Sequence, residues 1–507
     1  MESKQTIEAA HSHDDYPQDP EAAKSNVKAS DMDAALKFIN HADDLPPMTP
    51  EDEKRLVRKI DWSIMPLMFG CYFLQYTDKT LINYANIMGL QQDTHIDGNQ
   101  FSQLALIFYV TYLAFEFPAG YLMQILPTAK FLGANVICWG IMVACTAAAK
   151  SWGTLVALRV LLGCFEAAVA PALILITSMW YKKSEQPVRV SIWYLGISVG
   201  QMVGAVTSFG FQHYKGSAFK SWQIMFLVYG LITVAVGLLV VFTMPDNPMV
   251  SRLSDTEKRW AIARLRENMT GIENKSFKKH QVVECLLDPQ TWLLSMAVMS
   301  SSIPNGFIST YSSTVIKTFG FTSEVSALMG IPSGAFTLIL TITCGSLAGK
   351  HNMRGVFAVA LLLVSTVGSC LLRFLPAEGY VAGKMVGTYL ALCTGASLGL
   401  MYSYAAANFS GHTKKATLNA ILLTCFCIGN IIGPLTFRDK DKPLYIPAKI
   451  AMAITNAFAA LCIIALVIYY KWENRRRDRV YANVEHVPNS EFFNLTDREN
   501  HEFRYAL

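Results

Sequence analysis

Charged residues are scarce in this chain. Asp, Glu, Lys and Arg make up 16% of its 507 residues, against about 25% in an average soluble protein. Hydrophobic residues make up 52%. They gather into runs of about twenty, the length at which an α-helix crosses a hydrocarbon core about 30 Å thick. This composition excludes an ordinary soluble protein and predicts an all-α membrane protein that lies in a lipid bilayer.

Several signals of other protein classes are also missing. The first fifty residues contain no apolar stretch, so we expect no signal peptide. The net charge is only +5 and no basic patch alternates with aromatic residues, so nucleic acid is not an expected partner. Nucleotide-binding loops, zinc-binding helix motifs and nucleophile elbows do not occur. We therefore expect no enzyme activity, no cofactor and no metal.

The eleven cysteines do not include a Cys-x-x-Cys pair, and all but Cys285 fall inside apolar runs. A cysteine in such a run behaves as a small hydrophobic residue. The cysteine pattern therefore favours a packing role over metal binding or redox chemistry.

The apolar runs predict about twelve transmembrane helices in two sets of six. The expected spans are residues 61–81, 101–124, 129–149, 155–180, 190–211 and 222–244, then 291–317, 325–348, 356–374, 381–408, 416–437 and 446–470. Between the sets, the Pro-Asp-Asn-Pro sequence at 245–248 ends a helix because proline cannot continue the hydrogen-bond ladder. Ser254 and Glu257 have capping-box spacing, which predicts a short surface helix through Trp260 and Leu265.

The same pattern divides the chain into five parts. They are a disordered acidic tail at 1–54, a first six-helix bundle at 55–245, a central loop at 246–288, a second six-helix bundle at 289–471, and a second tail at 472–507. Neither tail has the pattern of a folded domain. Lys and Arg gather in the terminal regions and the central loop. By the positive-inside rule, both termini and this loop are expected to be cytoplasmic.

The two sets of helices resemble each other in sequence. Gly200-x3-Gly204 has a counterpart in Gly429-x3-Gly433, and Gly120-x9-Lys130 has one in Gly345-x8-Arg354. These matches favour two parallel pseudo-repeats, an arrangement that places a solute site between the halves near the middle of the membrane. Gly196, Gly200 and Gly204 also lie on one helical stripe, which predicts close packing of that helix against a neighbour.

Few ionisable residues lie well inside the predicted spans: Asp78, Lys79, Glu116, Arg159 and Glu166. Each charged side chain at the centre of a bilayer costs roughly 2.5 to 3.5 kcal/mol. Two interpretations remain open. The five residues could form buried ion pairs that hold helices together, or they could line a polar cavity whose cations bind an anionic solute and whose carboxylates exchange a proton. All ten histidines lie outside the predicted spans, so a histidine proton relay is not expected.

The spacing of these residues adds some detail. Arg159 and Glu166 are seven positions apart and therefore project from nearly the same helical face, whereas Asp78 and Lys79 are adjacent and point about 100° apart. Glu116 lies beside Pro118, where it could face either the cavity or a neighbouring helix. Two further bases, Arg373 and Lys384, lie near span ends, where long side chains can reach toward the membrane interface.

The chain resembles the major facilitator superfamily, in particular the anion:cation symporters of the fungal allantoate permease type. The resemblance covers about residues 55 to 480. Its motifs are Tyr76-Thr77-Asp78-Lys79, Asn83-Tyr84-Ala85, Leu155-x3-Arg159-x3-Gly163-x2-Glu166-Ala167-x3-Pro171, Met179-Trp180-Tyr181, Pro245-Asp246-x-Pro248, Gly429-Asn430-Ile431-Ile432-Gly433-Pro434 and Asn474-Arg475-Arg476-Arg477-Asp478. It implies the major facilitator fold and alternating access driven by an ion gradient, usually of protons.

The resemblance also implies roles for particular residues. Asp78 and Glu166 occupy the proton-coupling positions, and Lys79 occupies the position that binds the substrate carboxylate, where most relatives have arginine. Lysine keeps the charge but lacks the planar two-pronged geometry of arginine. Tyr112 corresponds to a cavity-lining aromatic residue, and Asn430 is a polar contact from the second half. Arg159 is the further cation that we expect to bind substrate.

Two motifs depart from the superfamily pattern. The loop after the second span reads Gly120-x3-Gln124-Ile125 where Gly-x3-Asp-Arg/Lys is usual. The ionic contacts that this motif provides on the cytoplasmic face are therefore expected to be weaker. Gly200 is followed by Gln201 instead of proline, which counts against a drug:proton antiporter.

The expected function is proton-coupled symport of a small organic anion, such as a ureido acid or a vitamin. The expected form is a monomeric multi-pass protein of the plasma membrane. The alternative is an exporter of an acidic secondary metabolite that belongs to a biosynthetic pathway.

Overall fold

The computed structural model describes residues 48–182, 184–214, 216, 218–269, 278–376, 379–480, 495–500 and 502–507, and the regular secondary structure in these residues is entirely helical. The first bundle contains α2 (Pro50–Ile87), α3 (Leu90–Asp93), α4 (Gly98–Ile125), α5 (Thr128–Thr146), α6 (Trp152–Glu166), α7 (Val169–Trp180), α8 (Gln186–Tyr194), α9 (Gly196–Gln212) and α10 (Ser221–Thr243). The expectation for residues 1–54 falls almost wholly outside the described residues.

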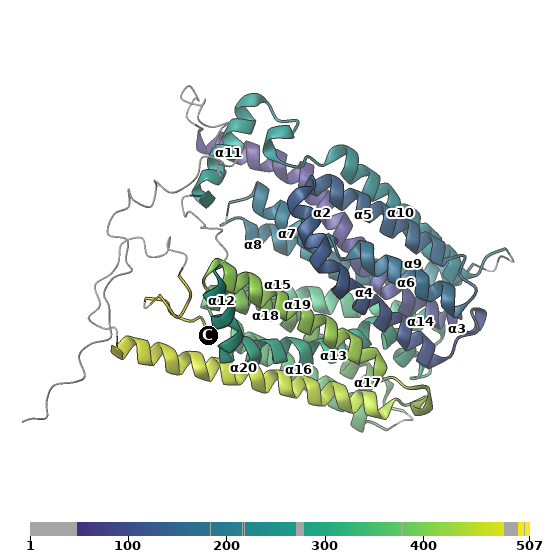
Figure 1. Cartoon of the computed structure of the whole chain (residues 1–507). Helices are drawn as coiled ribbons and strands as arrows, with labels where there is room; N and C mark the ends of the chain where they lie inside the picture. Colours follow the sequence, from purple (N-terminus) through teal and green to yellow (C-terminus); the bar gives the residue numbers. More distant parts are fainter. Residues whose placement is uncertain are drawn as a thin grey trace, which may run out of the picture.

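The second bundle contains α13 (Pro289–Lys317), α14 (Ser323–Leu328), α15 (Gly330–His351), α16 (Arg354–Phe374), α17 (Val381–Ala391), α18 (Cys393–Asn408), α19 (His412–Leu435), η3 (Asp439–Asp441) and α20 (Ile446–Val480). Between the bundles lie η2 (Pro248–Val250), α11 (Asp255–Met269) and α12 (Lys279–Leu287). Figure 1 shows the two bundles side by side, with α11 and α12 at one end and α3 and α17 at the other. We call these ends the central-segment face and the opposite face.

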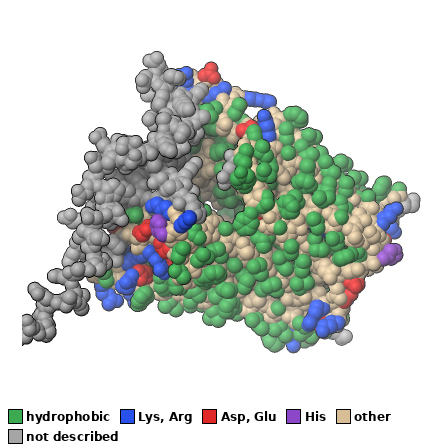
Figure 2. All heavy atoms as spheres, viewed as in Figure 1, with side chains coloured by type: hydrophobic (Ala, Val, Ile, Leu, Met, Phe, Trp, Pro, Cys, Tyr) green, Lys and Arg blue, Asp and Glu red, His purple; other side chains and the backbone are tan. Residues whose placement is uncertain are grey.

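Ten helical stretches in the described residues are long and apolar enough to cross a membrane. The remaining two long helices, α2 and α13, pack lengthwise against these stretches and bring the number of spans to twelve. Both carry many buried polar residues, such as Asp78 on α2 and Ser302 on α13, which lowers their hydropathy. Hydrophobic side chains cover the flanks of the molecule (Figure 2), as lipid contact requires. The predicted all-α fold is confirmed.

The predicted glycine stripe packs against α2. A Cβ atom added at Gly196 would lie 2.8 Å from the backbone nitrogen of Phe73, and one added at Gly200 would lie 3.0 Å from the Phe73 carbonyl oxygen. Larger residues would therefore push α9 away from α2. The glycines bring these two helices into backbone contact, as predicted.

Helix α11 begins at the predicted capping box. The Ser254 backbone N–H donates to the Glu257 carboxylate, and the Glu257 N–H donates to the Ser254 hydroxyl. Lys59 of α2 donates to Glu257, and the buried Arg264 guanidinium donates to Glu53 and Glu185. These contacts attach α11 to the first bundle, and the hydrogen bond from Lys59 holds the pKa of Glu257 below its usual range.

The end of the chain is folded, contrary to the expectation that neither tail would be. Helix α20 continues to Val480, and residues 495–500 and 502–507 pack on the second bundle at the central-segment face, whereas residues 481–494 lie outside the described part. The Tyr505 ring stacks on Tyr470 with 4.5 Å between ring centroids. Asn408 donates to the Ala506 carbonyl and accepts from the Ala506 N–H. Tail composition could not predict this packing because its partners lie on α18 and α20.

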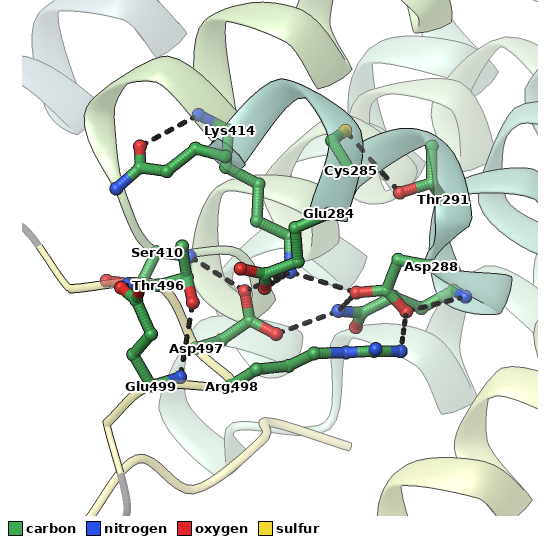
Figure 3. A network of polar contacts seen from close by, with 12 residues as sticks. Glu284, Cys285, Asp288, Thr291, Ser410, Lys414, Thr496, Asp497, Arg498 and Glu499 are labelled. Atoms are coloured by element: carbon green, nitrogen blue, oxygen red, sulfur yellow. Dashed lines mark hydrogen bonds and ion pairs between the residues drawn. The ribbon is translucent and has the colours of Figure 1, made fainter. Parts of the chain in front are cut away.

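A buried ion cluster fastens this segment (Figure 3). The fully buried Lys414 ammonium at the start of α19 lies 2.8 Å from Glu284 Oε1, 2.9 Å from Asp288 Oδ2 and 2.8 Å from Asp497 Oδ1. Arg498 donates to the other oxygen of Asp288 at 2.9 Å. Each charge in the cluster therefore has a close partner of opposite sign, the arrangement that makes a buried ion pair tolerable.

Candidate functional site

Helix α2 places Asp78 and Lys79 in different surroundings. Asp78 is 3% exposed and accepts a 3.3 Å hydrogen bond from the Trp139 indole of α5. Lys79 points toward α4, where its ammonium lies 5.5 Å from the centre of the Tyr112 ring and 5.9 Å from that of Phe108. The structure thus separates the two adjacent side chains, as their 100° offset predicts.

Lys79 also reaches across to α6, where its ammonium lies 3.4 Å from Glu166 Oε1. Glu166 is the last residue of α6, and a short break at Ala167 and Ala168 separates it from α7. The second bundle has a break at Leu392, between α17 and α18. Interrupted helices near the membrane centre are typical of transporter solute sites.

Arg159 lies two turns before Glu166 on α6 and is also buried. Its charge acts on both Asp78 and Glu166. The structure therefore brings together all four charges predicted in the first and fourth spans. Their formal sum is zero, with two acids and two bases, and Glu116 of α4 also lies within electrostatic range of Lys79.

Several polar atoms in this cluster lack hydrogen-bond partners within the described residues. They are one oxygen of Asp78, one oxygen of Glu116, both oxygens of Glu166 and the amide nitrogen of Gln75. The Lys79–Glu166 separation also exceeds the usual 2.7 to 3.2 Å of an N–H···O hydrogen bond. The Lys414 cluster of the same chain has three contacts of 2.8 or 2.9 Å. The Lys414 cluster is therefore fully paired, whereas the cluster around Lys79 and Glu166 is incompletely paired.

Glu116 of α4 faces the second bundle. It lies within electrostatic range of Tyr402 on α18 and Cys427 on α19, and of Tyr112 on its own helix. Glu116 thus lies on the side of α4 that faces the second bundle, and its place in a cavity stays a prediction.

Asn430 lies apart from the charge cluster. It is fully buried in the second bundle, accepts a 2.9 Å hydrogen bond from Asn305 and donates to the Phe426 carbonyl. Both polar groups of its amide are thus engaged in helix packing, and its role toward a solute stays a prediction.

The structure adds two residues to the cluster that sequence reasoning missed. Gln75 lies one helical turn before Lys79, close to Glu166, and the four-residue spacing was an available signal. Trp139 had no comparable signal, because its contact with Asp78 depends on how α5 packs against α2.

Hydrogen bonds between the bundles gather near the opposite face. Asn83 of α2 donates to Ser312 at 3.0 Å and to Ser313 at 2.9 Å, and the Ser102 hydroxyl of α4 lies 2.5 Å from the Tyr311 hydroxyl. Toward the central-segment face the surface is hollowed between the bundles (Figure 2). The Lys79 side chain remains 21% exposed. The cluster is therefore closed off from the opposite face by contacts between the two bundles.

Known proteins that are similar to this chain share its helical transporter fold. A model of the Major Facilitator Superfamily matches residues 68–434. The chain is 36% identical to the Thiamine pathway transporter THI73 of Saccharomyces cerevisiae, over 95% of each chain. It is 35% identical to the Allantoate permease of the same yeast, over 94% of this chain and 90% of that one. The solved xylose transporter XylE from E. coli, in an inward open conformation, matches with a TM-score of 0.63 at 14% identity, covering 78% of this chain and 95% of that one.

Proposed function

The chain belongs to the Major Facilitator Superfamily, a family of transporters and not of enzymes, and we propose that it moves a small organic anion together with a proton across a membrane by alternating access. The observation that carries this proposal is the incompletely paired contact between Lys79 and Glu166. A carboxylate solute is the proposed cargo, and a ureido acid or a vitamin is the proposed class. The similarity to a protein named for allantoate supports this choice.

In this proposal the solute carboxylate and Glu166 compete for the Lys79 ammonium, and this competition couples solute binding to proton binding. A solute carboxylate that reaches the Lys79 ammonium displaces Glu166 from it. An isolated, fully buried carboxylate is costly because it has lost its hydration, and proton uptake by Glu166 removes that cost. Anion binding and protonation therefore favour each other, which is the linkage that symport requires.

The other cluster residues have supporting roles in this scheme. Arg159 is the second cation for the anionic solute, and Tyr112 lines the path beside Lys79. Asp78, held by Trp139, balances the charge of Arg159 and is the second proposed proton carrier. Glu116, on the side of α4 toward the second bundle, is the proposed cavity carboxylate.

The proposed orientation places the central-segment face and both termini in the cytoplasm, because Lys and Arg gather there. The structure then corresponds to the cytoplasm-facing state of the cycle, with the contacts around Asn83 as the closed outer gate. We further propose a monomer in the plasma membrane. The same cycle run backwards would export an acidic metabolite, and the direction follows the gradients of proton and solute.

Uptake by purified protein in liposomes tests the proposal. Radiolabelled organic acids, with allantoate first, are offered with an imposed pH gradient that is acidic outside. The native protein is expected to concentrate its solute above equilibrium. Glu166→Gln, which cannot carry a proton at this position, is expected to equilibrate the solute without concentrating it.

Asp255→Asn is the matched control, because this exposed carboxylate of α11 lies far from the cluster, and it is expected to behave as the native protein does. If Glu166→Gln concentrates solute as well as the native protein, Glu166 is not the coupling residue. If no organic anion is transported by the native protein, the proposed solute class is wrong.

A further inference from the structure

A short segment of the second bundle reaches the first bundle at the opposite face. This segment, residues 436–445, joins α19 to α20 and contains η3, and we call it the strap. Both of its ends are fastened to its own bundle. The Phe437 ring stacks on Tyr311 of α13 with 4.7 Å between ring centroids, and the Tyr445 ring lies 4.9 Å from that of Phe437. Because Phe437 and Tyr445 are buried there, the strap has to move with the second bundle.

The middle of the strap contacts the first bundle. Gly98, the first residue of α4, donates its backbone N–H to Asp439 Oδ2 at 3.1 Å, and Lys442 forms an ion pair with the same carboxylate. The N–H groups of a first helical turn have no partner within their helix, and the helix dipole favours a negative charge beside them. The N-cap residue Asp97 already accepts from the Gln100 N–H. Asp439 therefore supplies a second carboxylate to this helix end, and it comes from the other bundle.

Glycine at position 98 allows this close approach. A Cβ atom added at Gly98 would lie 2.7 Å from Asp439 Cγ, a separation at which one of the two must move. The carboxylate is the end of a side chain, whereas position 98 belongs to the backbone of α4, so Asp439 is the group that moves. An alanine at position 98 would therefore break the contact between the bundles and leave both backbones in place.

A polar cavity of about 180 Å³ lies beside this contact. Its lining includes Asn86 and Gln91 from the first bundle, and Tyr311, Asp439 and Lys442 from the second. A water molecule takes up about 30 Å³, so the cavity has room for several. Water can therefore replace the hydrogen bonds of Asp439 when the strap lifts, which lowers the cost of breaking the contact.

We propose that the strap is a latch that holds the opposite face closed through Asp439 and leaves α4 each time that face opens. The Ser102 hydroxyl of α4 also donates to the Phe437 carbonyl at 3.3 Å. Since the strap moves with the second bundle and α4 with the first, the bundles cannot part here while Gly98 stays bonded to Asp439. The latch rests on the proposed transport cycle, and it adds a second closing element to the contacts of Asn83.

A reversible disulfide tests whether the latch opens during transport. The Cβ position at Gly98 lies near enough to the Asp439 side chain for cysteines at both positions to form a disulfide. In liposomes, the Gly98→Cys/Asp439→Cys variant is expected to lose nearly all uptake of the radiolabelled organic acid that the native protein transports when it is oxidised, and to regain it on reduction. Each single cysteine variant, treated with the same oxidant, controls for the native cysteines.

Hydrogen exchange of the purified full-length protein tests the latch without any solute. Asp439→Ala and Gly98→Ala each remove the charge-assisted hydrogen bond. Exchange in residues 309–317 of α13 is therefore expected to become about tenfold faster or more in each variant, because the face that these residues help to close opens more often. The double variant should be no faster than either single variant, since both changes break the same contact.

Asp441→Asn and Gly210→Ala are the matched controls, and both should exchange as the native protein does. Asp441 is the other acid of η3 and pairs with Arg438 of the same strap. A Cβ atom at Gly210 would meet no atom of another segment within 4 Å.

Two results would overturn the latch. One is faster exchange in Asp439→Ala and Gly98→Ala only within residues 436–445, or no change, since the contact would then order the strap without closing the face. The other is equal uptake by the oxidised and reduced forms of the double-cysteine variant. If the native protein transports no organic anion, the proposed cargo is wrong, and hydrogen exchange alone decides the latch.

Discussion

Asn83 of the first bundle and Ser313 of the second bond to each other in both directions. The Asn83 amide nitrogen donates to the Ser313 hydroxyl at 2.9 Å, and the Ser313 backbone N–H donates to the Asn83 amide oxygen at 3.0 Å. One residue of α2 thus contacts both the side chain and the backbone of α13, five positions along from Asp78. Helix α2, which carries Asp78 and Lys79 of the charge cluster, therefore also forms part of the contact that closes the opposite face.

Asn83→Ala should weaken this closure. It removes three hydrogen bonds to Ser312 and Ser313, each worth about 0.5 to 1.5 kcal/mol net. The population open toward the opposite face is therefore expected to rise about tenfold or more. Faster hydrogen exchange in residues 309–317 of α13 would report this change. Asn135→Ala is the control, since Asn135 bonds only to Phe131 of its own helix among the described residues, and equal exchange in the two variants would contradict the assignment.

Lys79→Gln should weaken the binding of an anionic solute. A charge-assisted hydrogen bond contributes about 1.5 to 3 kcal/mol, so KM for uptake is expected to rise about 10- to 100-fold. Lys79→Arg keeps the charge and should retain most of the affinity. Uptake kinetics in liposomes across a concentration series measure both variants. An unchanged KM in Lys79→Gln, with Lys317→Gln as the control for an exposed base, would remove Lys79 from the binding site.

Asp78→Asn should destabilise the first bundle. Arg159 is buried within electrostatic range of Asp78 but, among the described residues, makes no direct ion pair with it, so removing this negative charge is expected to cost no more than about 3 kcal/mol, the low end for breaking a buried pair. Trp139→Phe deletes the hydrogen bond to Asp78 and keeps the carboxylate, so a loss nearer 1 kcal/mol is expected. Denaturant or thermal unfolding ranks the two variants. The reverse order would show that Asp78 does not serve as the counterion of Arg159.

Asp497→Asn should loosen the end of the chain. Asp497 is fully buried and accepts from Lys414, Gln290 and Tyr505, so we expect a loss of about 3 to 5 kcal/mol in stability. The exposed pair between Asp478 and Arg504 supplies the control, because Asp478→Asn should cost no more than about 1 kcal/mol. Denaturant unfolding curves of Asp497→Asn and Asp478→Asn measure the two losses of stability. Similar losses would mean that the buried cluster contributes no more than a surface pair.

The charge cluster was partly predictable. Charged residues in apolar runs stand out because a membrane interior penalises them whatever the fold, so Asp78, Lys79, Arg159 and Glu166 could be selected without coordinates. Which acid meets which base could not be predicted. The contact of Lys79 with Glu166 joins α2 to α6, and its length depends on how those helices pack against α4.

Lys414 and Lys449 illustrate the same limit. Both lie in the first turn of a long helix, and their local sequences do not distinguish them. Lys414 contacts three acids from distant segments, whereas the charged groups that act on Lys449 within the described residues are Lys384 and Arg373. The difference comes from residues far away in the chain.

By itself, the amino-acid sequence determined that this protein crosses a membrane many times, in two related halves with charges near the membrane centre. Hydrophobicity and helical length are local properties, so they can be read along the chain. Only the tertiary structure decided that the bundles meet through Asn83 at one face, that Glu166 stays incompletely paired, and that the end of the chain folds back onto Lys414. Those features depend on which helices become neighbours, because burial and charge pairing arise only when segments distant in sequence pack together.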